Sequence, residues 1–204
     1  MLFLIFAEYN IGVIGGGSSH NLYVEKSAGK YKYINTGDDE IAGSNANGGY
    51  FKLFLNYQMN LMNNLDVKIE LYGGKDFAKL RENEKDVIKP GIFFGAMAKG
   101  ELDFYETYSL FAGIGLYCAP NFKIQHEDFH SQEKGHFLPT LTVSVGGSYY
   151  LNDRVSLCCE ITHIGFWWGN GIKTEKGPKN IHQSGLRIGV GINVQFEQLP
   201  FLKR

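Results

Sequence analysis

Proline is scarce in this chain, and no continuous apolar run is long enough to form a membrane-spanning helix. Five prolines stand against 26 glycines, and aromatic residues make up 14% of the 204 residues, which is a β-rich profile. A β-barrel needs no long apolar run to cross a membrane, because its strands interleave apolar residues with polar ones. Neither sign of charge predominates, since the net charge is −1, and no broad attraction to nucleic acid is expected.

Cysteine is scarce as well. The three cysteines, Cys118, Cys158 and Cys159, cannot all pair with one another, and two of them are adjacent. Their spacing matches no zinc-binding pattern. We therefore expect them to be small apolar fillers on strands.

The clearest pattern that is present is the two-residue alternation of residues 186–196. Successive side chains of a strand point to opposite faces, so this strand has one apolar face and one face that is polar or very small. Its length is close to the roughly 9–11 residues that a tilted strand needs to cross a bilayer, which predicts lipid outside and a polar lumen inside. The apolar row is Leu186, Ile188, Val190, Ile192, Val194 and Phe196, and the other row is Arg187, Gly189, Gly191, Asn193 and Gln195.

Seven other segments alternate in a similar way. Along the chain, the connections between the strands are alternately long and short. Outer-membrane barrels have short periplasmic turns and longer extracellular loops. The sequence therefore predicts an all-β fold, an eight-stranded antiparallel up-and-down transmembrane β-barrel. The expected strands are 8–17, 49–59, 65–77, 91–102, 107–119, 138–151, 154–167 and 183–196; the short connections are 60–64, 103–106 and 152–153; the long ones are 18–48, 78–90, 120–137 and 168–182.

Alternation alone does not say which face is inward, because a soluble lipocalin-like barrel places its apolar face inside. Three features favour the opposite arrangement: glycine and serine on the polar face, charges of both signs on the same face, and aromatic residues near the strand ends of the apolar face. The interior charge network is predicted to comprise Lys52, Lys68, Glu70, Lys99, Glu101, Glu160 and Arg187, with Arg187 pairing with glutamates such as Glu160. The membrane girdle is predicted to comprise Phe51, Tyr57, Tyr108, Tyr149, Trp167 and Phe196.

The layout resembles small outer-membrane β-barrels of the OmpA-like and opacity-type surface antigen group. Residues 108–116 and 143–151 look like the central hairpins of that group, and residues 191–196 are similar to its C-terminal assembly signal. That signal normally ends the protein, whereas residues 197–204 follow it here. The resemblance implies the outer membrane of a Gram-negative-type bacterium, but it implies no single activity, because this fold hosts adhesins, structural proteins and lipid-modifying enzymes.

One histidine suggests a function of another class. His163 falls in the lipid-facing register of its expected strand, and a bulge after Thr162 would re-aim it. Lipid A deacylases are outer-membrane barrels that use a histidine and a nearby serine at the membrane face, and here a serine–histidine pair would have to form across strands, with Ser184. A lipid-A-modifying hydrolase is therefore one alternative, and a narrow porin-like channel is another.

The third long connection holds residue types that bind metals. They follow no fixed ligand spacing, and we expect a solvated polar loop rather than a metal site. These residues are His126, Glu127, Asp128, His130, Glu133 and His136.

The predicted function is non-enzymatic, with no catalytic, cofactor-binding or metal-binding residues. We expect one domain over residues 1–204: a monomeric outer-membrane surface protein of antigen or adhesion type that displays four extracellular loops on a rigid barrel with a filled polar interior. The expected partners are outer-membrane lipids and lipopolysaccharide, the barrel-assembly machinery, and a host or surface ligand bound through residues 18–48, 120–137 and 168–182, with no nucleic acid. Both chain ends should be periplasmic; residues 1–7 are either a signal-peptide remnant or the lead-in to the first strand, and residues 197–204 are a periplasmic tail.

Overall fold

The computed structural model describes the backbone of most of the chain. The described residues are 7–27, 30–33, 45–62, 64–82, 85–89, 91–105, 107–119, 123–126, 129–134, 140–165, 172–174 and 177–196, with side chains over 8–20, 47–62, 64–79, 91–105, 107–119, 140–165 and 184–196. The interpretations of residues 1–6 and 197–204, and the girdle prediction for Trp167, lie outside them. No helix in the described part of the chain is long and apolar enough to cross a membrane.

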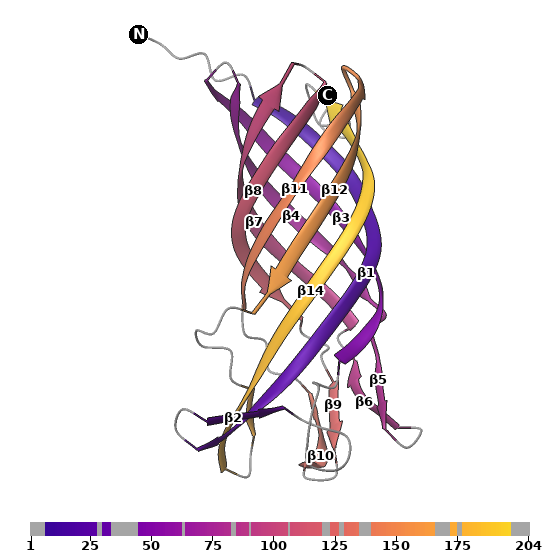
Figure 1. Cartoon of the computed structure of the whole chain (residues 1–204), viewed down its shortest axis with the longest axis vertical. Coiled ribbons are helices and arrows are strands. Elements are labelled where there is room, and N and C mark those ends of the chain that lie inside the picture. Colours follow the sequence, from indigo (N-terminus) through magenta and orange to yellow (C-terminus); the bar gives the residue numbers. More distant parts are fainter. Residues whose placement is uncertain are drawn as a thin grey trace, which may run out of the picture.

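Eight long strands form a closed barrel (Figure 1). Each is antiparallel to the next in chain order, and the last pairs with the first, so the sheet has no open edge within the barrel. The predicted eight-stranded antiparallel up-and-down barrel is confirmed. Its strands are β1 (Ala7–Ser27), β3 (Asn45–Met62), β4 (Leu65–Asp76), β7 (Gly91–Phe104), β8 (Tyr108–Cys118), β11 (Thr140–Asn152), β12 (Val155–Ile164) and β14 (Gly177–Phe196).

The first and last strands are about twice as long as a bilayer requires. β1 has 21 residues and β14 has 20, whereas about 9–11 residues cross a bilayer. The two strands pair from Tyr9 opposite Phe196 as far as Val24 opposite Ile181. Together they extend beyond one end of the barrel, while the short turns lie at the other end (Figure 1).

Short strands occupy parts of the four connections that the sequence predicted as loops, which corrects that prediction. β2 (Lys30–Tyr33) pairs with β1, and β13 (Ile172–Thr174) pairs with β14. A separate sheet has the strand order β10-β9-β6-β5. The strands of this separate sheet are β5 (Leu80–Glu82), β6 (Lys85–Lys89), β9 (Lys123–His126) and β10 (Phe129–Lys134). Like β2 and β13, they are too short for their alternation to stand out in the sequence.

The burial of side chains alternates along the barrel strands and sets the direction of each face. Along β12, the polar residues Ser156, Glu160 and Thr162 are buried, whereas Leu157 and Ile161 are exposed. The same inversion occurs throughout the barrel, because exposed large apolar residues cover the outside while charged residues are buried inside. The soluble lipocalin-like alternative, with its apolar face inside, is therefore contradicted.

His163 lies on the outward face of β12. It pairs with Val143 on one side and Leu186 on the other, and neither ladder shifts register at this position. No bulge re-aims the side chain, and His163 keeps the lipid-facing position that strict alternation gives it.

Inward glycines make room for inward aromatic rings on neighbouring strands. Gly146 lies directly opposite Phe111, and a Cβ atom at Gly146 would be 2.4 Å from the ring carbon Cζ. In this crowded interior a glycine serves for close approach rather than for an unusual backbone angle. The same relation joins Gly12 to Phe54, Gly74 to Phe93 and Gly95 to Tyr72.

We expect the substitution Gly146→Val to destabilise the barrel by about 1–3 kcal/mol, because the added atoms crowd the carbonyl oxygen of Cys159 and the ring of Phe111. Gly100→Val is the matched control, since a Cβ atom at Gly100 would meet nothing within 4 Å. Guanidinium unfolding in lipid vesicles, followed by circular dichroism, measures both. An equal loss in the two variants would show that crowding around Gly146 is not the cause.

Candidate functional site

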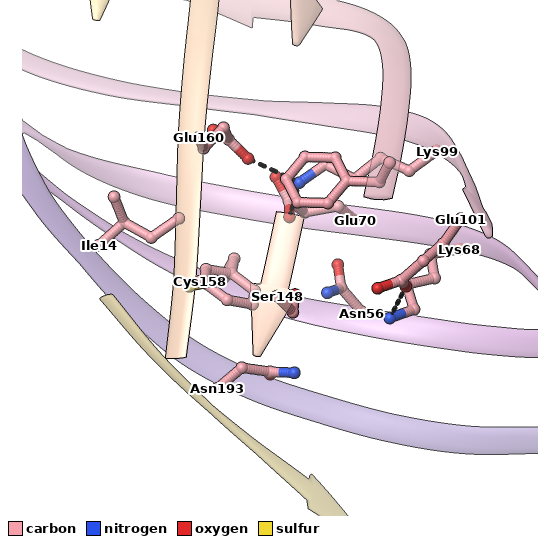
Figure 2. Close-up of a pocket in the computed structure, with 12 residues that line it drawn as sticks. Ile14, Asn56, Lys68, Glu70, Lys99, Glu101, Ser148, Cys158, Glu160 and Asn193 are labelled. Atoms are coloured by element: carbon pink, nitrogen blue, oxygen red, sulfur yellow. Dashed lines mark hydrogen bonds and ion pairs between the residues drawn. The ribbon is translucent and has the colours of Figure 1, made fainter. Parts of the chain in front are cut away.

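Four ionised side chains meet inside the barrel and form a closed ring. Lys99 Nζ lies 2.6 Å from Glu70 Oε2 and 2.7 Å from Glu160 Oε2. Lys52 Nζ lies 3.2 Å from Glu70 Oε1 and also contacts Glu160 Oε1. Each cation thus pairs with both carboxylates, and the ring, which we call the central ring, is neutral as a whole. Figure 2 shows Glu70, Lys99 and Glu160 turned toward one another inside the barrel.

The central ring draws on four different strands, β3, β4, β7 and β12. All four side chains are buried, and buried charges are tolerated only when they are paired and hydrogen-bonded. Aromatic faces add to this support, because Lys99 Nζ lies 4.5 Å from the centre of the Phe111 ring. The ring therefore ties distant strands together through the lumen.

A second cluster lies nearer the short turns. Lys68 pairs with Glu101, which also accepts a hydrogen bond from the Ser109 hydroxyl, and the Lys68–Glu101 pair is drawn in Figure 2. Closer to the turns, the Tyr150 hydroxyl donates to Asp103 at 2.9 Å. Hydrogen bonds therefore fill this end of the lumen as well.

A third cluster, near the opposite end, is centred on Asp76. Arg187 donates to Asp76 Oδ2 from Nε at 3.0 Å and from Nη2 at 2.8 Å. His20 Nε2 lies 2.8 Å from the same oxygen, and the Ser18 hydroxyl donates to Oδ1 at 2.8 Å. The Arg187 guanidinium also lies 3.8 Å from the centre of the Phe93 ring. We call this group the Asp76 cluster.

The predicted pairing of Arg187 with Glu160 is wrong, and neither Asp76 nor His20 was predicted to lie inside the barrel. The carboxylate of Glu160 is already engaged by Lys52 and Lys99, so Arg187 pairs with Asp76 instead. His20 was assigned to a long connection, although β1 continues to Ser27 and its burial alternates as far as His20. Following the two-residue period beyond Gly17 would have placed it inside.

Side chains leave little free space in the middle of the lumen, between the described strands. The cavity between the central ring and the Lys68–Glu101 pair has a volume of about 20 Å³, which is room for about one water molecule. No group of His, Cys, Asp and Glu among the described residues is arranged to hold a metal ion. The side chains of the histidine-rich residues 126–136 lie outside that description.

We expect the refolded barrel to show no steady single-channel conductance in a planar bilayer, because the Asp76 cluster and the central ring fill the lumen in succession. Recording from the purified protein at both voltage polarities tests this. A reproducible ohmic step that scales with salt concentration would contradict a filled interior.

The residues predicted to form a membrane girdle fall at two ends of the wall. At the short-turn end, the Tyr57 ring is 5.6 Å from that of Tyr9, which lies opposite Phe196. Tyr108 and Tyr149 face each other across β8 and β11. At the other end, the rings of Phe51 and Phe77 are 6.1 Å apart. Their girdle role stays a prediction.

On the outward face, His163 is within reach of one serine. Its Nε2 lies 3.4 Å from the Ser184 hydroxyl, and both side chains are half-buried. Ser184 belongs to β14, two residues before the direct partner of His163, so the contact is diagonal across the ladder. The three cysteines form no disulfide: Cys118 and Cys158 are buried, and Cys159 is exposed.

Comparisons with known proteins give likenesses of fold. No protein-family model matches the chain, and no curated protein is significantly similar to it. Among solved structures, Neisserial surface protein A is 14% identical, with a TM-score of 0.46 over 92% of this chain and 97% of that one. Ail, the attachment invasion locus protein of Yersinia pestis, solved with the heparin analogue sucrose octasulfate, is 13% identical, with a TM-score of 0.46 over 93% and 99%.

An enzyme also appears among the matching structures. The outer membrane protease OmpT of Escherichia coli is 11% identical, with a TM-score of 0.39 over 93% of this chain and 96% of that one. The matches include small outer-membrane barrels of the group that the sequence resembles.

Proposed function

We propose that the chain is a non-enzymatic surface protein of a bacterial outer membrane, of antigen or adhesion type. The observation that carries this proposal is the inverted barrel, in which apolar residues cover the outside and paired charges fill the inside. Such a wall is stable only against lipid. A filled lumen leaves the surface beyond the membrane as the part that meets other molecules.

The extension beyond the barrel suits display. β1 and β14 continue past the wall as a paired ribbon flanked by β2 and β13, and the sheet of β5, β6, β9 and β10 lies at the same end (Figure 1). Binding residues concentrate on segments that a rigid scaffold positions. We assign ligand binding to residues 18–48, 120–137 and 168–182, with lipopolysaccharide and the assembly machinery as membrane partners of a monomer.

Surface labelling of intact cells tests the display. An epitope inserted between residues 38 and 39 should be labelled without permeabilisation, whereas one in the turn at Asn152–Asp153 should be labelled only after it. Attachment of these cells to host-cell or matrix surfaces should then fall when residues 34–44 are replaced by a glycine-serine linker. Equal labelling of both epitopes would contradict the proposal. So would attachment that stays unchanged when such a linker is placed in turn within residues 18–48, 120–137 and 168–182.

A lipid-modifying hydrolase is a second candidate, favoured by one contact. His163 and Ser184 lie 3.4 Å apart on the lipid-facing side of the wall, which places an imidazole base beside a hydroxyl nucleophile, two of the groups that nucleophilic catalysis uses. Mass spectrometry of lipid A from cells that overexpress the wild type, Ser184→Ala or the control Ser19→Ala separates the candidates. Loss of acyl chains in the wild type and the control, but not in Ser184→Ala, would support the hydrolase.

A further inference from the structure

The inward face of the barrel is acidic where it meets the short turns. The inward residue nearest the turns is Glu8 on β1, Asp66 on β4 and Asp103 on β7. We call these carboxylates the acidic rim. The corresponding inward residues of the other strands are uncharged, and they are Asn60, Ser109, Tyr150, Ser156 and Gln195.

The described side chains do not supply enough counter-charge for the acidic rim. Asp66 lies directly opposite Glu101, and Asp103 follows Glu101 by two residues on the same face, so like charges stand together on neighbouring strands. Lys68 is engaged by Glu101. Arg154, in the turn between β11 and β12, is exposed and forms no ion pair with the rim. The rim therefore carries negative charge that a further cation would balance.

Buried oxygens beside the acidic rim lack hydrogen-bond donors as well. Asn10 is 1% exposed and Asp66 is 3% exposed, yet the Oδ1 atom of each has no hydrogen-bond partner among the described residues. Gln58 joins the two side chains, because it accepts from Asn10 at 2.8 Å and donates to the other oxygen of Asp66. Buried polar atoms are normally hydrogen-bonded, and both of these atoms are acceptors. The site therefore suits a group that is both a donor and a cation, such as an ammonium or a guanidinium.

Exposed apolar side chains border the acidic rim. The Asp103 N–H donates to the Asn64 carbonyl at 3.0 Å, which joins the turn after β7 to the turn after β3. At these turns Leu61 is 57% exposed, Met62 is 66% exposed and Tyr105 is 88% exposed. Tyr105 also has a φ of 53°, a left-handed conformation that a bulky residue rarely adopts. This mouth of the lumen thus combines negative charge with apolar surface.

The segment that follows β14 has the complementary composition. Its middle is apolar and its far end is basic, whereas its single acid, Glu197, stands next to β14. An apolar stretch followed by two cations matches apolar turns beside an acidic rim. The apolar residues are Leu199, Phe201 and Leu202, and the cations are Lys203 and Arg204.

The same segment starts close enough to reach the acidic rim. Phe196 is in register with Ile69 of β4 across β1 and β3. Neighbouring strands lie about 4.8 Å apart and successive residues about 3.3 Å apart, so the path over the sheet from Phe196 to Asp66 is about 18 Å. Lys203 follows Phe196 by seven residues, which span about 23–25 Å when extended. The lysine therefore reaches Asp66 with length to spare.

We propose that residues 197–204 dock on the short-turn mouth of the lumen of the same molecule. Lys203 and Arg204 pair with the acidic rim and supply the charge and the hydrogen-bond donors that it lacks. The apolar residues of the segment cover the exposed side chains of the two joined turns. The end of the lumen opposite the Asp76 cluster is thereby covered by the chain itself.

Disulfide trapping in the full chain, folded in detergent micelles, tests the docking. Leu202→Cys is combined with Met62→Cys in one variant and with Asp153→Cys in the control, after the three native cysteines are replaced by alanine. The Gln195 N–H donates to the Arg154 carbonyl at 2.8 Å, so the control site lies beside the start of the segment. A segment that moved freely would link to this nearer site, whereas docking favours the link to Met62→Cys.

The acidic rim is tested in the same assay. Asp66→Asn and Asp103→Asn should each lower the yield of the link to Met62→Cys by about two- to fivefold, because each removes one ion pair. The chain with its native cysteines gives a second measurement. A carbodiimide, which joins an ammonium to a carboxylate, should couple Lys203 to the half-buried Asp103 and not to the exposed Asp153.

Three results would overturn the proposal. The first is a link to Asp153→Cys that forms as readily as the link to Met62→Cys. The second is a link to Met62→Cys that does not respond to Asp66→Asn or Asp103→Asn, because charge would then not hold the segment. The third is a disulfide between two molecules, seen as a dimer on a gel, which would assign the segment to a neighbouring copy. If the chain without native cysteines shows no heat-dependent gel shift, and so has not folded, the carbodiimide coupling decides.

Discussion

Replacing Glu160 with methionine is expected to lower the free energy of unfolding of the barrel by about 3–5 kcal/mol. Glu160 contacts both Lys52 and Lys99 in the central ring. The substitution leaves two buried ammonium groups with Glu70 as their shared carboxylate, and an uncompensated buried charge is strongly destabilising. Guanidinium unfolding of the protein in lipid vesicles, followed by circular dichroism, measures the loss.

The double variant Lys99→Met with Glu160→Met is the decisive control. It removes one charge of each sign and leaves the pair of Lys52 and Glu70, whose atoms are 3.2 Å apart. We expect it to regain most of the stability that Glu160→Met loses, because methionine is apolar and flexible enough to fill the space. A double variant no more stable than the single one would mean that packing, and not unpaired charge, determines the effect.

Arg187→Met is expected to cost a similar amount, about 3–5 kcal/mol, at the other end of the lumen. Arg187 supplies two hydrogen bonds to Asp76 and stacks on Phe93. Without it, the buried carboxylate loses its permanently charged partner. The same unfolding measurement applies, because the barrel unfolds as one closed sheet.

Two variants separate charge from packing in the Asp76 cluster. Adding Asp76→Asn to Arg187→Met should recover part of the loss, since no buried anion is then left unpaired. Lys75→Met removes an exposed cation beside the same strand end, and we expect it to change stability by no more than about 0.5 kcal/mol. A loss in Lys75→Met as large as in Arg187→Met would mean that burial does not set the cost.

The barrel was predictable because its signal is a period of two repeated in each strand. In residues 186–196 every outward position is apolar, and the inward position of Arg187 follows from the same count. The inward placement of Lys52, Glu70 and Glu160 likewise needs only the period and the sign of each face. The structure buries all three.

Partners within the lumen were not predictable in the same way. The carboxylate that pairs with Arg187 is determined by strand tilt and by how far each side chain reaches across the barrel. A local sequence pattern predicts neither of these. Asp76 and His20 lie 56 positions apart in the sequence and meet only because β1 continues beyond the membrane-length segment. The short strands of the extension pair with other short strands, so their existence depends on tertiary context that no single segment carries.

Because β1 pairs with β14, closure of the barrel is the last step of its folding. Tyr9 finds its partner at Phe196, so the first strand waits for nearly the entire chain before one of its edges is paired. Pairing of such distant segments is slow, and the unpaired edge of β1 from Tyr9 to Val24 is a template for aggregation. A chain cut short before β14 would carry two such edges, one on β1 and one on β12, and would depend on other proteins to keep them covered.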